Sequence, residues 1–87
     1  MKRKDGFILQ TIGEDTFAVA VTPAAATVGS MVKLNPTAAY LFELLETERT
    51  EEDCVAAILD RYGIDPAIAA RDVHIFLTRL KEAGLLA

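Results

Sequence analysis

The chain has 87 residues, a formal net charge of −4, a pI near 4.8 and 52% hydrophobic residues. That length suffices for one compact domain, which we expect to span residues 1–87, and the composition excludes a disordered chain. The acidic balance argues against non-specific nucleic-acid binding, which needs basic residues to displace counterions from phosphate.

A β-hairpin is predicted at the N-terminal end. Residues 7–12 and 16–21 are rich in β-branched and aromatic residues, as strands are, and Gly13-Glu14-Asp15 between them is typical of a short turn. Residues 22–29 contain proline and glycine, so we expect them to form a connecting loop, although the alanines are also compatible with a helical turn.

A third strand is expected at residues 31–34. Because side chains alternate across a strand, Val32 and Leu34 should share one face, and Met31 and Lys33 the other. Leu34 is the best core candidate of the four.

The first long helix is predicted to begin directly after this strand. Asn35 is a favoured N-cap, and proline at the first helical position gives up a donor that has no partner there. Apolar residues then follow the helical spacing i, i+3, i+4 and i+7 up to a predicted end near Thr47. These residues are Ala38, Leu41, Phe42 and Leu45.

A second helix is predicted from the N-cap Thr50 to the C-cap Gly63, with three acidic residues in its first turn, where the helix dipole favours carboxylates. Its expected buried stripe consists of Val55, Ile58, Leu59 and Tyr62.

A third helix should begin at Asp65-Pro66 and end at Gly84. Its central apolar stripe, expected to face the core, consists of Ala69, Val73, Phe76, Leu77 and Leu80. Beside that stripe lies a flank that mixes apolar and charged side chains, formed by Ile68, Asp72, Ile75, Arg79 and Ala83. The predicted order is therefore three strands followed by three helices, an α+β fold.

The inventory of reactive side chains argues against an enzyme. The chain has one histidine, His74, which should face solvent, and one cysteine, Cys54, which is best explained as a small buried hydrophobe. It has no Gly-rich phosphate loop, so we expect no catalytic residues, no metal site and no cofactor. No apolar run approaches the roughly 18 residues of a membrane span, and no signal-peptide core is present, so we expect a cytoplasmic protein without a membrane partner.

The mixed flank of the third helix and the third strand could together form a binding groove. If residues 31–34 lie at a sheet edge, their free amides and carbonyls would accept an extended peptide as an added strand. The candidate peptide-binding residues are Met31, Val32, Lys33, Leu34, Ile68, Asp72, Ile75 and Arg79. The alternative is purely structural: Ile68 and Ile75 cover the hairpin, and the strand is an ordinary edge strand blunted by Lys33.

A specific order of segments runs through nearly the whole chain, at residues 6–9, 34–45, 50–52, 62–65, 72–73, 76–77, 80 and 83–86. In this order and spacing the chain resembles the PqqD family, which includes the peptide chaperone of pyrroloquinoline quinone biosynthesis and related recognition elements for the precursors of ribosomal peptide natural products.

The resemblance implies a small winged-helix-like domain that binds the leader segment of a precursor peptide and presents it to a modifying enzyme, such as a radical SAM enzyme. It also implies that the leader is held against the third strand, in a groove closed by the third helix. Two positions depart from the family pattern: Phe42 stands where tryptophan is common, and Glu48-Arg49 replaces a frequent glycine.

Two other classes of function remain open. A winged-helix DNA-binding or transcription-associated domain could have the same helical order, but the third helix mixes Arg71, Arg79 and Lys81 with Asp72 and Glu82, and no basic stripe results. A structural homodimer, formed by pairing of edge strands, is the third possibility.

Overall fold

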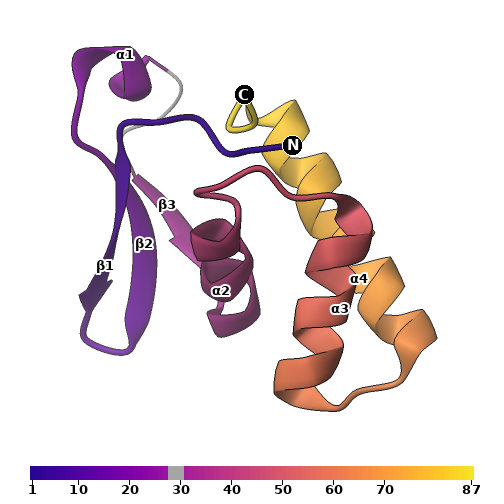
Figure 1. The fold of residues 1–87 in the computed structure, drawn as a ribbon. Coiled ribbons are helices and arrows are strands. Elements are labelled where there is room, and N and C mark those ends of the chain that lie inside the picture. Colours follow the sequence, from indigo (N-terminus) through magenta and orange to yellow (C-terminus); the bar gives the residue numbers. More distant parts are fainter. Residues whose placement is uncertain (28–30) are drawn as a thin grey trace.

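The computed structural model describes residues 1–27 and 31–87, so the part of the predicted loop at residues 28 and 29 lies outside the described residues. The elements in chain order are β1 (Phe7–Ile12), β2 (Asp15–Ala20), α1 (Pro23–Ala26), β3 (Met31–Leu34), α2 (Pro36–Leu44), α3 (Glu51–Tyr62) and α4 (Pro66–Glu82). The predicted α+β fold is confirmed: three N-terminal strands are followed by the three long helices (Figure 1).

The three strands form one antiparallel sheet in the order β1-β2-β3. Ile12 pairs with Asp15, so the hairpin turn is tighter than expected and Asp15 belongs to β2. Gly13 occupies this turn at φ 64°, a left-handed conformation that glycine adopts without steric cost. In β3, Leu34 is buried while Met31 and Lys33 are exposed, which confirms the predicted alternation.

The prediction of a continuous loop after β2 is wrong at Pro23–Ala26, which form the short helix α1. Thr22 caps this helix, because its side-chain oxygen accepts a hydrogen bond from the Ala25 amide at 3.1 Å. Gly6 makes room for this contact. Its φ is 94°, and a Cβ atom there would lie 2.5 Å from the Thr22 hydroxyl oxygen.

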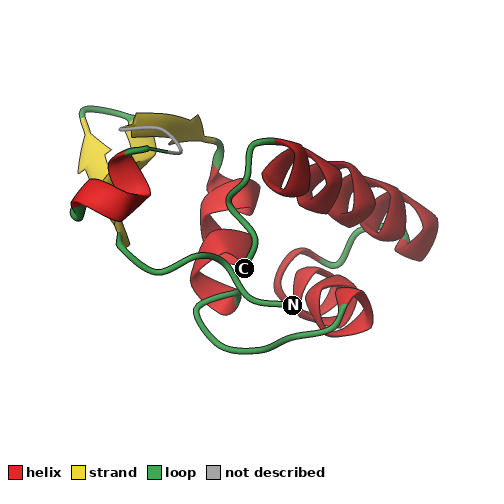
Figure 2. Ribbon diagram, turned by 90° about the horizontal axis from the view of Figure 1, so that it is seen from above, coloured by secondary structure: helices red, strands yellow, loops and turns green. Residues whose placement is uncertain are grey.

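Helix α2 lies between the sheet and the pair formed by α3 and α4 (Figures 1 and 2). The Ala38 amide donates to the Asn35 side chain at 2.8 Å, which confirms the predicted cap. Phe42 is buried and packs edge-on against Phe7, with 6.2 Å between ring centroids. The helix ends at Leu44, earlier than predicted, because the chain turns at Leu45 and buries that side chain completely.

Both predicted caps of α3 are confirmed. Thr50 and Asp53 form a reciprocal capping box, and Gly63 ends the helix at φ 60°. Cys54 is fully buried, as predicted. The prediction that Tyr62 belongs to the buried stripe is wrong: its side chain is 39% exposed at the helix end and packs edge-on against Tyr40 at the surface.

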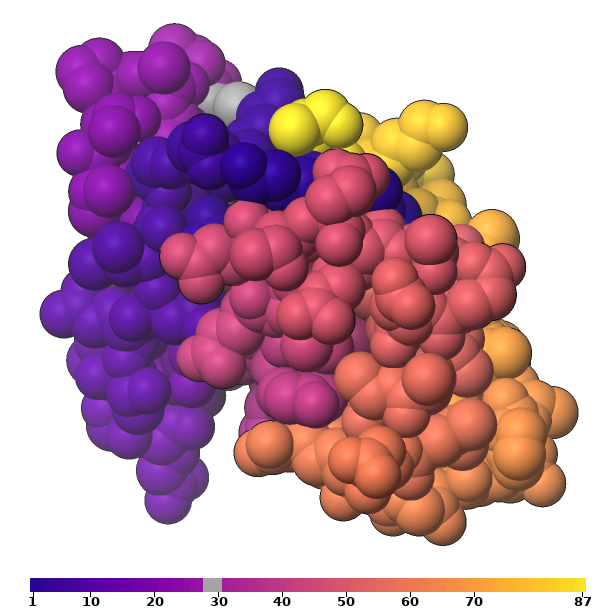
Figure 3. Space-filling model, viewed as in Figure 1, coloured from indigo at the N-terminus to yellow at the C-terminus, as the bar shows by residue number. Residues whose placement is uncertain are grey.

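The two ends of the chain pair with each other across the top of the molecule in Figure 1. The Lys4 amide donates to the Leu85 carbonyl at 2.8 Å, and the Ala87 amide donates to the Lys2 carbonyl at 2.8 Å. The Arg3 amide donates to the Leu45 carbonyl at 2.9 Å, so the same segment also contacts the end of α2. Figure 3 shows this N-terminal segment extending from the sheet across to the C-terminal residues.

We predict that Gly6→Ala destabilises the protein more than Gly13→Ala does. At both positions the fold requires a left-handed backbone conformation, which costs alanine about 1–3 kcal/mol. The added methyl group would clash with the Thr22 side chain at position 6, whereas at position 13 it would have no atom within 4 Å. Chemical denaturation measures the two free energies of unfolding. Equal losses would show that the contact between Gly6 and α1 has no energetic role.

The capping box should also contribute to the acid sensitivity of the fold. The Thr50 backbone amide, and secondarily its hydroxyl, lower the pKa of Asp53 below its ordinary 3.8. Because the pKa is lower in the folded state, this stabilisation is present above pH 3.8 and is lost as the pH falls through the folded-state pKa. Asp53→Asn should therefore flatten the acid limb of a plot of unfolding free energy against pH. An unchanged limb would contradict this assignment.

Candidate functional site

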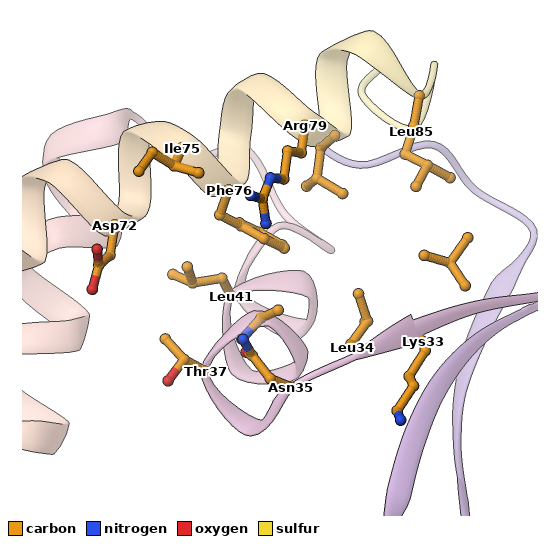
Figure 4. Close-up of a pocket in the computed structure, with 14 residues that line it drawn as sticks. Lys33, Leu34, Asn35, Thr37, Leu41, Asp72, Ile75, Phe76, Arg79 and Leu85 are labelled. Carbon is orange, nitrogen blue, oxygen red and sulfur yellow. The ribbon is translucent and has the colours of Figure 1, made fainter.

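A groove of about 590 Å³ lies between β3 and α4, with α2 as its floor (Figure 4). Its volume falls within the range of about 300–1,000 Å³ that is common for ligand sites. The groove is lined by Val32, Lys33, Leu34, Asn35, Thr37, Ala38, Leu41, Asp72, Ile75, Phe76, Arg79, Leu80, Ala83 and Leu85.

The strand wall of the groove is an edge of the sheet. Strand β3 pairs with β2 on one side, and within residues 1–27 and 31–87 no strand pairs with its other side. Leu34 is buried toward the core, and Lys33 lies 3.4 Å from Asp15 in an ion pair and points away from α4 in Figure 4. The strand therefore presents main-chain groups along its free edge, and the Lys33 charge does not block that edge because it pairs with Asp15 of β2.

The helix wall of the groove combines one aromatic ring with charged side chains. Phe76 was expected in the core, but it is only half-buried and points toward Leu41 on the floor (Figure 4). Arg79 lies beside it on the next turn, and Asp72 lies one turn before it. Helical spacing aligns these positions because residues three and four apart are neighbours on one helix face.

Six of the eight predicted peptide-binding residues line this groove: Val32, Lys33, Leu34, Asp72, Ile75 and Arg79. Met31 lies on the outer face of the sheet, beside Val19, and Ile68 lies in the first turn of α4; neither lines the groove. Their part in binding stays a prediction. Ile68 and Ile75 are 44% and 41% exposed, which argues against the alternative that they cover the hairpin.

Sequence reasoning missed the floor of the groove. Asn35, Thr37, Ala38 and Leu41 belong to the start of α2, and only the three-dimensional arrangement places that helix between the two walls. The position of Phe76 in the groove could have been predicted from its spacing. It lies four residues after Asp72 and three before Arg79, so it belongs as much to the mixed flank as to the core stripe.

The single histidine and the single cysteine of the chain lie outside the groove. His74 is exposed, as predicted, and its Nδ1 lies 3.3 Å from the Glu51 carboxylate across α3 and α4. Burial raises the pKa of the Cys54 thiol, which lies in the core. Among the described residues no group of three or more His, Cys, Asp or Glu could hold a metal ion.

None of the helices in the described part of the chain is long and apolar enough to span a membrane. The groove offers a ligand apolar surface, a strand edge that no other strand of the described residues covers, and the charge of Arg79, whereas the Asp72 carboxylate is already paired with Arg71.

The chain belongs to the PqqD family. The family described as "Coenzyme PQQ synthesis protein D (PqqD)" matches residues 7–86, and this confirms the predicted relationship. No curated protein sequence matches the chain.

Two solved structures share the fold. One, titled "TbiB1 in Complex with the TbiA(beta) Leader Peptide", has a TM-score of 0.74 and 26% identity, and the match covers 99% of this chain and 94% of that one. The other, titled "Lasso peptide synthetase B1 complexed with the leader peptide", has a TM-score of 0.70 and 20% identity over 97% and 93% of the two chains. The second likeness establishes the fold alone.

We predict that the helix wall tolerates substitution without loss of the fold. Ile75→Asp should change the free energy of unfolding by no more than about 0.5 kcal/mol, because the side chain is exposed. Leu77→Asp, two residues along the same helix, should unfold the protein because that side chain is 95% buried. Thermal denaturation followed by circular dichroism compares the two. Unfolding of the Ile75 variant would place Ile75 in the core.

Proposed function

We propose that residues 1–87 form one domain that binds the leader segment of a ribosomally made precursor peptide, without catalysing a reaction itself. Membership of the PqqD family supports this function, as does the likeness to TbiB1, which was solved with a leader peptide. The observation in this chain that carries the proposal is the free edge of β3 beside an apolar groove.

The leader would bind as a fourth strand of the sheet. Main-chain hydrogen bonds to β3 would supply affinity that is independent of sequence, and alternate peptide side chains would enter the groove. Strand β1 also lies at a sheet edge, but it contributes no residue to the groove, so an added strand there would gain no helix wall. The edge of β3 is therefore the better acceptor.

A non-catalytic domain of this kind acts by delivering its peptide to another protein. We propose that the partner is a peptide-modifying enzyme, such as a radical SAM enzyme, and that both act in the cytoplasm. Because the added strand would be held by a leader segment, the rest of the precursor would stay free to enter the active site of the enzyme.

The other two possibilities have less support. DNA binding is not favoured, because the mixed charges of α4 form no basic stripe and the similar protein TbiB1 was solved with a leader peptide. Pairing of two copies through β3 stays a prediction; it would compete with the peptide for the same edge and would appear as a peptide-dependent change in sedimentation.

The proposal is tested by titrating labelled protein with the leader peptide encoded beside it and following backbone amide shifts. Shifts should concentrate on β3 and on the groove face of α4. Ile75→Asp should weaken binding by about fivefold or more, because the peptide would bury the exposed part of the isoleucine side chain but would have to desolvate a carboxylate in its place.

Ile64→Asp is the matched control, because Ile64 is also partly exposed but lies outside the groove. It should bind as the wild type does. The proposal would be wrong if the shifts fell on other surfaces, or if both variants bound the leader equally well.

A further inference from the structure

We propose that Arg79 is a specificity-determining residue that selects peptides with a carboxylate two positions from an apolar side chain. This inference rests on the proposed function and names the class of peptide that the groove accepts.

Four of the five arginines have a partner within the protein. Arg3 lies over the ring of Phe42, Arg61 lies over that of Tyr40, and the Arg49 guanidinium donates to Thr47. Arg71 forms an ion pair with Asp72 at 3.2 Å. Among the described residues, Arg79 takes part in no ion pair, side-chain hydrogen bond or cation–π contact of this kind.

The unpartnered guanidinium lies in the groove. Arg79 lines the groove and extends from α4 toward its floor beside Phe76 (Figure 4). Two other charged side chains of the groove already have partners of opposite sign: Asp72 pairs with Arg71, and Lys33 pairs with Asp15. Arg79 is therefore the charge that a ligand would have to match.

A carboxylate is the matching group. A guanidinium presents N–H donors in a planar fork that fits a carboxylate, and charge-assisted hydrogen bonds are stronger than neutral ones. Arg79 is itself exposed, so Phe76 and Leu80 beside it would shield the pair from solvent only in part. The protein has a net charge of −4, so this selection is a local effect that opposes the overall repulsion of an acidic ligand.

Helix and strand geometry set the spacing of the peptide residues. Phe76 and Arg79 are separated by about 4.5 Å along the helix axis, since each residue rises about 1.5 Å. Side chains on one face of an extended peptide recur at about 6.6 Å, which the length of the arginine side chain can accommodate. One groove-facing peptide residue would thus contact Phe76, and the next on the same face would meet Arg79.

Selection from a displayed library of random twelve-residue peptides tests this inference on the wild type, Arg79→Glu and Lys81→Glu. Lys81 also lies in the last turn of α4 but does not line the groove. Lys81→Glu therefore changes the net charge by the same amount as Arg79→Glu, but outside the proposed binding site. Wild type and Lys81→Glu should enrich an acidic residue two positions from an apolar one. Arg79→Glu should enrich a basic residue at that position.

Synthetic peptides from the selection give the size of the effect. Replacing the selected glutamate by glutamine should weaken binding to the wild type about fivefold, as for a partly exposed ion pair, and less than twofold to Arg79→Gln. Groove-binding peptides without acidic enrichment, or the same enrichment with Arg79→Glu, would overturn the role of Arg79 while leaving peptide binding intact. If no selected peptide shifts the amides of β3 or α4, the proposed function itself fails and this inference fails with it.

Discussion

The structure depends on the junction at which β3 becomes α2. The Ala38 amide donates to the Asn35 side chain at 2.8 Å, and Pro36 occupies the first helical position, where its missing amide costs nothing. Leu34, the last residue of the strand, is buried in the core. The cap and this buried side chain fix one face of β3 to the core and to α2. The edge of β3 that does not pair with β2 has no strand partner among the described residues.

The facing wall is held by other side chains of the same core, so the folded protein itself positions both walls of the groove. Val73, Leu77 and Leu80 hold α4 in the core, and Leu85 continues that contact beyond its end. The N-terminal segment then joins the two halves, since Lys4 donates to the Leu85 carbonyl and Arg3 donates to the Leu45 carbonyl. A preformed groove would lower the ordering cost of binding a flexible peptide to a strand of only four residues.

The features that could be predicted from the sequence are those set by neighbouring residues. The caps at Asn35, Thr50 and Gly63 follow local chemistry, and the alternation in β3 follows strand geometry. The floor of the groove could not be predicted, because the position of α2 between two walls depends on contacts between residues distant in sequence. Phe76 packs against the core as predicted, but its partial exposure was not predicted for a related reason: helical periodicity identifies an apolar stripe but cannot say where its buried part ends.

The central claim, that a leader peptide extends the sheet at β3, is tested most directly by scalar couplings across hydrogen bonds between labelled protein and labelled leader. The account predicts couplings between main-chain groups of alternate residues in Met31–Leu34 and those of the peptide. Couplings across the β2–β3 pairing should be present in the same sample. Couplings at the free edge of β1, or a bound peptide that contacts α4 without any coupling to β3, would contradict it.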